Sequence, residues 1–417
     1  MVFCAHGFYI SGIFRNPSLR QNVGAMLPLA TCAVSVFFIL SGFVLTWSAR
    51  PSDTAVRIWR RRAAKIYPNH IVTWALVVVF LAVYGGHAYV ITTPGPLDWR
   101  TAAANLFLIQ TWIPNWNSMN SVNVPSWSLS CELFFYLLFP LLLWIVKKIP
   151  RRRLWPCAAA TVLASLSVPC LTLLFKGPDI LPGIHLSLDQ MWLAYVFPPG
   201  RLPEFLLGML LARIVGEGLW RPTRVRYAVL ALIATFALVP VLPPSFAFGP
   251  VYAAPAGFLV ATIATLDIHS MRSQLRRRTM VFLGDRSYAL YLIHYVVIYY
   301  TRQLLFPAEG LSWPLAIAAA LLVMLPLSLL AAGVLYAAVE HPLYRRLADS
   351  QQAGITARPA DKALGGQPVL EYAGAQASDG NISALGENAD DSRRLSSTTD
   401  HEHIYRRRGE TDPSDVG

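Results

Sequence analysis

The chain alternates between long apolar runs and short polar segments, and few charged residues fall inside the runs. Each run is close to the ~20 residues that an α-helix needs to cross ~30 Å of hydrocarbon. The pattern therefore predicts an all-α integral membrane protein whose helices form a bundle. The predicted spans are residues 27–48, 68–91, 127–146, 154–175, 192–214, 227–243, 250–268, 281–304 and 313–339.

Two further apolar segments are too short to cross a membrane. Residues 1–14 have the character of the second half of a span, so we expect about ten crossings, the first of them truncated. This expectation includes a translation start upstream of Met1, or an incomplete chain. Residues 101–113 predict a helix that is partly embedded in the membrane or lies at its interface.

Basic residues mark one set of loops. Loops 49–67, 147–153, 215–226 and 269–280 together hold 18 Lys and Arg, whereas the intervening loops hold 5. Cytoplasmic loops of membrane proteins carry an excess of basic residues. This asymmetry agrees with ten crossings of the plasma membrane, and it predicts that both termini, including the C-terminus, are cytoplasmic.

The C-terminal segment has a different composition. From residue 351 onward apolar periodicity is lost, and 11 acidic residues accompany 7 basic ones. Such a segment buries too little apolar surface to offset the entropy of ordering it. We therefore divide the chain into a membrane domain, residues 1–347, and a disordered cytoplasmic tail, residues 348–417.

Composition narrows the function classes. The chain is 55% hydrophobic, and its net charge of +12 is concentrated in loops, so we do not expect nucleic-acid binding. The five cysteines show no CxxC pair and no Cys/His metal spacing, which favours inert thiols and predicts no metal site. The motifs of soluble phosphate-loop, serine-hydrolase and zinc enzymes are absent from the sequence.

Ionisable residues inside apolar runs are the main candidates for chemistry. Glu132 lies in a run of otherwise lipid-compatible residues, and a charge at that depth is costly unless it faces protein or water. His6 lies on the first apolar segment and is a natural general base near neutral pH. Each also has a purely structural interpretation, as a hydrogen-bonding group between helices. For His294 and Glu340, the structural interpretation is favoured.

A basic cluster precedes the second complete span. It contains Arg60, Arg61, Arg62 and Lys65, and it runs directly into Tyr67. One interpretation is a plain topological anchor on the cytoplasmic side. The other is a site for a cytosolic ligand that carries several phosphates, since guanidinium groups bind phosphate well.

In these features the chain resembles the membrane-bound acyltransferase-3 family, from His6 to about residue 347. The resemblance implies transfer of an acyl group, commonly acetyl from acetyl-CoA, to a hydroxyl of a carbohydrate, a polysaccharide or a glycosylated or macrolide acceptor. The segments that carry it are residues 36–45 (VFFILSGFVL), 62–68 (RAAKIYP), 126–136 (SWSLSCELFFY), 202–208 (LPEFLLG), 287–294 (SYALYLIH) and 340–342 (EHP).

The resemblance also implies roles for particular residues. His6 matches the histidine of the first span that the family is thought to need, and Glu132 matches a carboxylate of the fourth span. Arg62 and Lys65 match the basic pair of the first cytoplasmic loop, where a second Arg is usual. A basic residue usual eleven positions before the histidine would fall ahead of Met1.

A mechanism follows as a hypothesis. The phosphates of acyl-CoA bind Arg60, Arg61, Arg62 and Lys65, and His6 takes the proton of the acceptor hydroxyl, either for direct attack or by way of an acyl-histidine. Glu132 orients His6 or binds the acceptor. Finally, Tyr136 and Ser128 contact the substrate and donate hydrogen bonds to the developing oxyanion.

Two other function classes remain open at this stage. Intramembrane carboxylates and histidines also serve proton-coupled transporters or flippases of glycans and amphipathic small molecules. A membrane receptor or scaffold that signals through the acidic tail is the third class.

Overall fold

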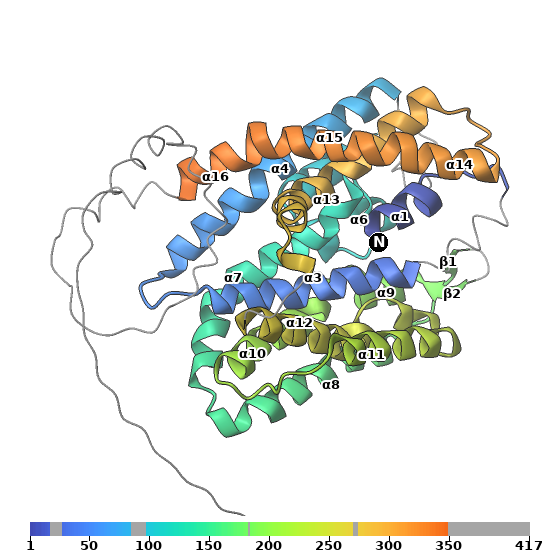
Figure 1. The fold of residues 1–417 in the computed structure, drawn as a ribbon. Helices are drawn as coiled ribbons and strands as arrows, with labels where there is room; N and C mark the ends of the chain where they lie inside the picture. The colour runs from blue at the N-terminus through green and yellow to red at the C-terminus, as the bar shows by residue number, and fades with distance from the viewer. Residues whose placement is uncertain (17–26, 85–96, 182–183, 270–273, 349–417) are drawn as a thin grey trace, which may run out of the picture. The chain divides into compact units, whose positions relative to one another are not determined.

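The computed structural model describes residues 1–16, 27–84, 97–181, 184–269 and 274–348. Residues 349–417 of the predicted tail lie outside these ranges. Almost every described element is helical, as the apolar runs predict (Figure 1). The two strands form one short antiparallel hairpin.

The elements of the first half, with η marking 3-10 or π turns, are α1 (Val2–Cys4), η1 (Ala5–Ile10), α3 (Leu27–Trp47), α4 (Ala55–Tyr84), α5 (Trp99–Leu106), η2 (Gln110–Trp112), α6 (Trp116–Met119), η3 (Val124–Ser126), α7 (Trp127–Lys148), η4 (Arg151–Arg153) and α8 (Leu154–Thr172).

Those of the second half are β1 (Asp179–Leu181), β2 (Ile184–Ser187), α9 (Leu188–Met191), η5 (Trp192–Val196), α10 (Pro198–Gly216), α11 (Val225–Leu238), η6 (Val239–Val241), η7 (Pro244–Ala247), η8 (Pro250–Tyr252), α12 (Ala253–Ile268), η9 (Gln274–Arg276), α13 (Arg278–Leu305), α14 (Trp313–Ala319), η10 (Ala320–Met324), α15 (Leu325–Leu335), η11 (Tyr336–Glu340) and α16 (His341–Ala348).

Six helical stretches of the described chain are long and apolar enough to cross a membrane, so ten crossings are not confirmed. Two predicted spans are helical but carry several charges, on α10 and α13, and the one containing α11 is short. The qualifying stretches are Leu27–Trp47, Ala55–Tyr84, Val124–Lys148, Arg151–Thr172, Pro250–Ile268 and Trp313–Arg346.

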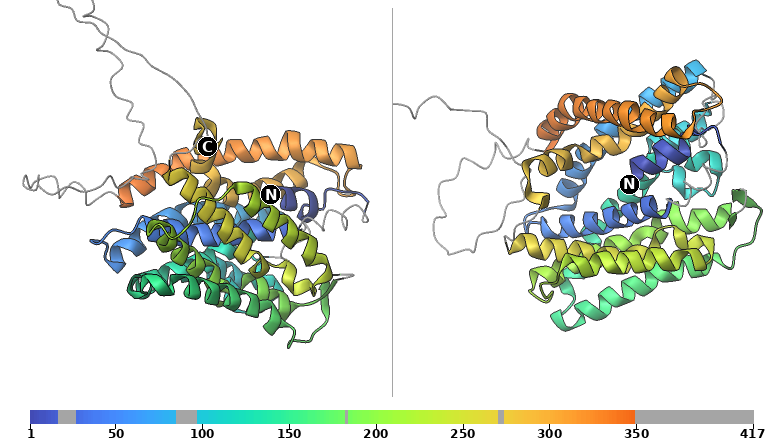
Figure 2. Two further views of the ribbon diagram at one scale, coloured as in Figure 1. Left: turned by 60° about the horizontal axis from the view of Figure 1, so that its bottom comes forward. Right: turned by 45° about the vertical axis from the view of Figure 1, so that its right-hand side comes forward.

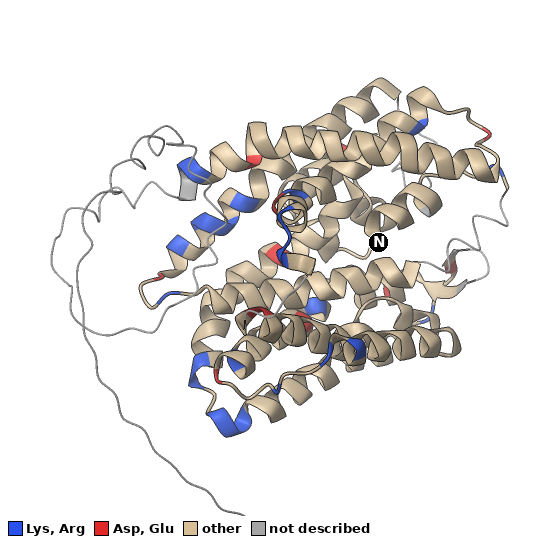
Figure 3. Cartoon of the chain, viewed as in Figure 1, with Lys and Arg blue, Asp and Glu red and all other residues tan. Residues whose placement is uncertain are grey.

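The start of α4 differs from the sequence prediction. The basic cluster was expected in a loop that ends at Tyr67, but α4 begins at Ala55 and carries the whole cluster on its first turns. Pro68 lies inside the helix and removes only one backbone donor, so the helix continues past it. Basic side chains therefore project from a rigid element, and Figure 3 shows them gathered with other Lys and Arg toward one end of the bundle.

The helices pack around two main hydrophobic cores. The first core is built mainly from α3, α7, α10 and α12, and the second from α4, α13, α14 and α15 (Figures 1 and 2). α13 contributes to both, since Leu292 belongs to the first core and Ile293 and Tyr295 to the second. The helix that carries His294 therefore lies at the seam between the two cores.

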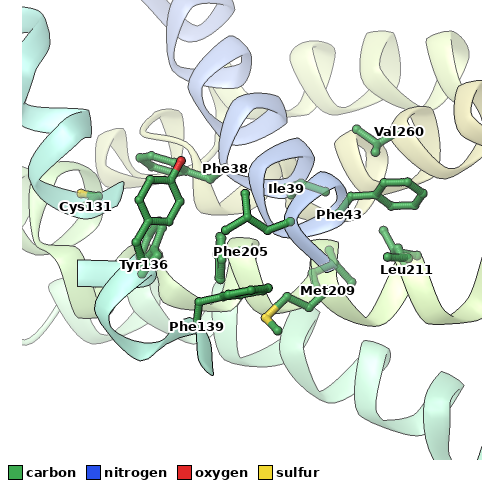
Figure 4. Packing of buried hydrophobic residues seen from close by; sticks show 14 of the residues in the cluster. Phe38, Ile39, Phe43, Cys131, Tyr136, Phe139, Phe205, Met209, Leu211 and Val260 are labelled. Carbon is green, nitrogen blue, oxygen red and sulfur yellow. The ribbon is translucent and has the colours of Figure 1, made fainter. Parts of the chain in front are cut away.

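Close backbone contact joins α3 to α10. A Cβ atom added to Gly42 would lie 2.0 Å from the carbonyl oxygen of Phe205, and one added to Gly208 would lie 1.9 Å from that of Ile39. Small residues permit this approach, which provides van der Waals contact where lipid removes much of the hydrophobic driving force. Figure 4 shows Phe38, Phe205 and their neighbours from α3, α7 and α10 packed beside this crossing.

Residues 97–126, named here the inserted segment, bury several polar side chains in the bundle and leave large apolar ones exposed, among them Trp99, Phe107 and Ile113. The predicted embedded helix at 101–113 corresponds to α5 and η2, and Asn105, Gln110 and Thr111 within it are fully buried. Leu108 and Val122 both have positive φ, at 58° and 52°. Because a β-branched residue rarely adopts this conformation, Val122 marks a strained turn that surrounding contacts must stabilise.

Candidate functional site

His6 lies on the π-helical turn η1, and the residues after this turn pair with the connection between α13 and α14. The backbone of the following residues pairs with Leu311, whose N–H donates to Ile13 O (2.8 Å) and whose carbonyl accepts from Arg15 N (3.0 Å). The His6 ring meets Tyr295 edge-on, with centroids 4.9 Å apart. The N-terminal segment thus presents His6 to the face of α13 that carries His294.

The two histidines are hydrogen-bonded to each other. His6 Nδ1 lies 2.8 Å from His294 Nε2, and the two rings are nearly parallel, with an interplanar angle of 2°. His294 Nδ1 lies 2.9 Å from the carbonyl oxygen of Leu290. His294 is buried, whereas His6 is half-buried.

This geometry fixes the proton positions in the neutral pair. A carbonyl oxygen only accepts, so His294 Nδ1 carries the proton and His294 Nε2 holds a lone pair. His6 Nδ1 must then donate to it, which leaves the lone pair of His6 on Nε2. Within the described residues no group hydrogen-bonds His6 Nε2. The pair therefore presents one basic nitrogen of fixed tautomer.

Glu132 has different partners from those expected for an orienting carboxylate. Its Oε1 accepts from Tyr136 at 2.5 Å, one helical turn along α7, and from Ser41 of α3 at 3.2 Å. The carboxylate is buried. In the described structure it is His294, and not Glu132, that fixes the tautomer of His6.

Tyr136 and Ser128 point to two different places. Tyr136 directs its hydroxyl proton to Glu132. Ser128 Oγ lies 2.8 Å from Tyr291 Oη, and both hydroxyls also lie 3.1 Å from the carbonyl oxygen of Pro125. Tyr291 is one turn from His294 on α13, with ring centroids 6.1 Å apart, so Ser128 is joined to the histidine pair through a single side chain.

The residues of the basic cluster have different surroundings. Arg61 pairs with Asp53 at 2.7 Å. Burial favours the neutral form of Asp53, but hydrogen bonds from Arg61 and from the backbone of Arg50 outweigh it and lower the pKa of Asp53 below its ordinary value of 3.8. Arg60 is exposed. Arg62 lies over the ring of Tyr136, 5.9 Å from its centroid, which places it beside the Glu132 group.

Lys65 reaches the last helical segments. It forms a salt bridge with the buried Glu340, whose second oxygen accepts from Asn69 at 2.6 Å. Lys65 also lies 5.6 Å from the ring centroid of Tyr288 on α13. Tyr288, Tyr291 and His294 are spaced by three residues, and six residues of α-helix rise about 9 Å. These three side chains thus form a stepwise path along α13 from the basic cluster to the histidine pair.

Sequence reasoning did not foresee two contacts of this site. His294 and Glu340 were both assigned structural roles, yet one is bonded to His6 and the other to Lys65. The spacing of three and four residues between small and polar side chains at positions 284, 287, 291 and 294 was the available signal for His294. No comparable signal existed for its partner, because 288 residues separate His6 from His294.

A second buried polar group surrounds Arg201 on α10, one of the helices of the first core. The Arg201 side chain is fully buried and uses all five N–H groups. Two contact Glu204 Oε2 (2.9 and 2.8 Å), one contacts Ser35 Oγ (3.1 Å), and the other two contact the carbonyls of Phe248 (3.1 Å) and Tyr195 (3.5 Å). Gly249, at φ 94°, makes room for the guanidinium, because a Cβ there would lie 2.0 Å from it.

Comparison with known proteins agrees with this architecture. Residues 1–333 match the family model of the acyltransferase-3 domain. The chain is 40% identical to the acyltransferase MdmB of Streptomyces mycarofaciens over 82% of its own length and 88% of that protein. It is 28% identical to the exopolysaccharide production protein ExoZ of Rhizobium meliloti, over 82% of this chain and 98% of ExoZ.

A more distant relative is the O-acetyltransferase OatA of Staphylococcus aureus, which is 24% identical over 65% of this chain and 46% of OatA. The chain therefore matches less than half of OatA. No solved structure matches the chain. Together with its apolar helices, the match over residues 1–333 shows that this multi-pass membrane protein belongs to the acyltransferase-3 family.

Proposed function

We propose that this protein is an O-acyltransferase that moves an acyl group, most simply acetyl, from acyl-CoA to a hydroxyl of a carbohydrate or of a glycosylated or macrolide acceptor. The observation that carries the proposal is the histidine pair, in which His6 Nε2 is the one basic nitrogen without a described partner. Acyl transfer to an alcohol needs a base of this kind in the membrane domain.

The reaction is balanced without an external acid or base. His6 Nε2 takes the hydroxyl proton as the acceptor oxygen bonds to the thioester carbonyl carbon, and the imidazolium returns that proton to the CoA sulfur when the C–S bond breaks. His294 accepts from His6 Nδ1 and stabilises the positive charge that develops on His6. General-base catalysis of this kind typically contributes 10²–10⁴-fold to the rate.

Arg62 and Lys65 are the basic residues closest to the path along α13, and we assign the donor phosphates to this end of the bundle. Lys65 is paired with Glu340, so donor binding there must compete with that salt bridge. Arg60 is exposed on the same helix and extends the positive surface, while Arg61 is neutralised by Asp53. Arg62 is therefore the main phosphate contact in this proposal.

The acceptor assignment rests on the hydroxyl groups near His294 and on the relatives. The hydroxyls of Ser128 and Tyr291 can both donate hydrogen bonds to a polyol and accept them from it, as they do with each other. Glu132, which accepts from Tyr136, lies on α7 between the basic cluster and the Ser128–Tyr291 pair. There it offers its carboxylate to sugar hydroxyls. ExoZ is named for exopolysaccharide production and OatA as an O-acetyltransferase, which supports a carbohydrate hydroxyl as acceptor.

The test uses membranes that contain the full chain, acetyl-CoA labelled in the acetyl group, and a panel consisting of a glycosylated macrolide, a bacterial exopolysaccharide and peptidoglycan fragments. We expect label on one acceptor class with wild-type protein, and a loss of at least 10²-fold with His6→Ala at equal protein in the membrane. His185→Ala is the matched control, because His185 is an exposed histidine that pairs with Asp179 on the β hairpin.

A second arm tests the donor site. Arg62→Glu should raise KM for acetyl-CoA with little change in KM for the acceptor, and Arg221→Glu, on a different loop, should not. If wild-type membranes transfer no label to any acceptor, or if His6→Ala retains wild-type turnover, the proposal is wrong. Movement of an unmodified acceptor across the membrane would instead favour a transporter.

A further inference from the structure

We propose that Asn123 is a positioning residue for the histidine pair, turned toward α13 by the left-handed backbone at Val122. This inference rests on the proposed function, since it concerns how His294 is held for acyl transfer. Asn123 is fully buried, and it belongs to the inserted segment and not to either helix that carries a histidine.

Asn123 bridges two helices with one amide nitrogen. Its Nδ2 donates to the carbonyl oxygen of Leu292 on α13 at 3.1 Å and to Thr73 Oγ1 on α4 at 3.2 Å. Because a carbonyl oxygen only accepts, the contact with Leu292 fixes which end of the amide faces α13. Leu292 lies between Tyr291 and His294, so the contact is made at the level of the histidine pair.

Pro125 of the inserted segment and Ser128 at the start of α7 hold the same turn of α13. Pro125 O accepts from Tyr291, and Ser128 Oγ lies within hydrogen-bond distance of the Tyr291 hydroxyl. Residues 123–128 therefore contact α13 at two successive positions, 291 and 292, just before His294. Small displacements of catalytic groups lower the rate by large factors, so loss of this contact should lower kcat.

The strain at Val122 explains why Asn123 points inward. Val122 is buried among apolar residues of the second core and has φ 52°. A β-branched residue in this region is unfavourable, and surrounding contacts must maintain it. Glycine adopts the same backbone without strain, so Val122→Gly retains the direction of the next side chain even though it loses apolar contact.

The contact with Thr73 connects this positioning to the basic end of the bundle. Thr73 Oγ1 lies 2.9 Å from the carbonyl oxygen of Asn69, and Asn69 donates to Glu340, the partner of Lys65. Lys65, Asn69 and Thr73 are four residues apart and share one face of α4. Asn123 thus completes a buried polar connection between the donor end and the histidine pair.

The experiment measures kcat and KM in membranes with labelled acetyl-CoA and the acceptor that wild-type protein acetylates. Asn123→Ala should lower kcat by about 10- to 100-fold, with KM for acetyl-CoA within twofold of wild type. Asn120→Ala is the matched control: Asn120 belongs to the same segment, but its Nδ2 donates to Trp116 O (3.0 Å), and its kcat should not change.

Asn123→Asp gives a readout that a merely structural role would not produce. An ionised aspartate cannot donate to Leu292 O, but a protonated one can, so its activity relative to wild type should recover as pH falls. Val122→Gly should retain at least a third of wild-type kcat. The pH profile of Asn123→Asp keeps the inference testable if Asn123→Ala does not reach the membrane.

Two results would overturn the inference while leaving the proposed function intact. One is a kcat for Asn123→Ala within twofold of wild type at equal protein. The other is an Asn123→Asp profile parallel to that of wild type at every pH. Failure of the proposed function differs from both, because wild-type membranes would then transfer no label at all.

Discussion

Two polar sites within the described bundle, the Arg201 group and the histidine pair, have opposite designs. Around Arg201 every N–H of the guanidinium has an acceptor, and the partners come from α3, α10, η5 and the turn between η7 and η8. In the histidine pair each ring donates through Nδ1, His6 to His294 and His294 to the carbonyl of Leu290, and His6 Nε2 has no partner among the described residues. Saturation suits a group that holds helices together, whereas an open nitrogen suits a group that moves a proton.

Charge strengthens this contrast. Arg201 and Glu204 are an ion pair whose removal from water is costly, so each depends on the other. The histidines are a neutral pair. Burial of a neutral pair costs less than burial of two charges, and removal of one histidine should cost little folding free energy. A change in the first site should therefore be detected as loss of folded protein, and a change in the second as loss of turnover.

Arg201→Met is the largest perturbation expected. It leaves Glu204 buried without its partner, and breaking a buried pair in this way costs about 3–5 kcal/mol of folding free energy. We expect little monodisperse protein after detergent extraction, measured by size-exclusion chromatography.

The double variant Arg201→Met/Glu204→Leu is the control, because it removes both charges and should recover most of the extracted protein. Normal recovery of the single variant would show that this pair does not hold the helices, and the contrast between the two sites would fail.

His294→Ala should have the second largest effect, and it should appear in kcat. Without His294, His6 keeps both of its nitrogens but loses its fixed tautomer and the group that stabilises its charge. We expect a fall of about 10²-fold in kcat, smaller than that of His6→Ala, with unchanged extraction from the membrane. Steady-state kinetics with labelled acetyl-CoA make the measurement.

His294→Gln sharpens the result, since an amide oxygen accepts from His6 Nδ1 and should restore part of the activity. If His294→Ala instead reduces extracted protein as Arg201→Met does, then His294 is structural, as the sequence pattern alone suggested.

Much of the fold could be predicted from the sequence, because spans are set by length and apolar composition. The structure differs from the prediction at the start of α4 and does not confirm α10 and α13 as spans, and at these places the two signals are weak. α4 begins at Ala55 because arginines are good helix formers, although a hydropathy pattern treats them as loop. α10 and α13 are less apolar than a lipid-facing helix because their polar residues face other helices, as Arg201 and His294 show.

The site was less predictable for a different reason. Glu132 and Tyr136 are one helical turn apart, so local spacing was enough to place them together. His6–His294 and Lys65–Glu340 join residues far apart in the chain, and hydropathy says nothing about which helices are neighbours. The resemblance to a family identified His6 and Lys65 individually, but their partners became visible only when the helices were placed in three dimensions.

The smallest predicted effect concerns Asp53. Its salt bridge with Arg61 is a third polar pair, and Asp53 itself lies outside the membrane-spanning helices. Its pKa is lowered in the folded protein, so its contribution to stability is fully present above the unfolded value of 3.8 and is lost as pH falls through the folded value. Asp53→Asn should lower the thermal midpoint at pH 7 slightly, corresponding to no more than about 1 kcal/mol for a partly exposed pair.

The difference from wild type should shrink as pH is lowered from 4 to 3, because protonation then removes the same charge from the native aspartate. Glu309→Gln is the control, since Glu309 is exposed and lies 3.8 Å from an equally exposed Arg15. A difference that stays constant over this pH range would mean that Asp53 acts through packing alone, and that its pairing with Arg61 does not help to fix the first turns of α4.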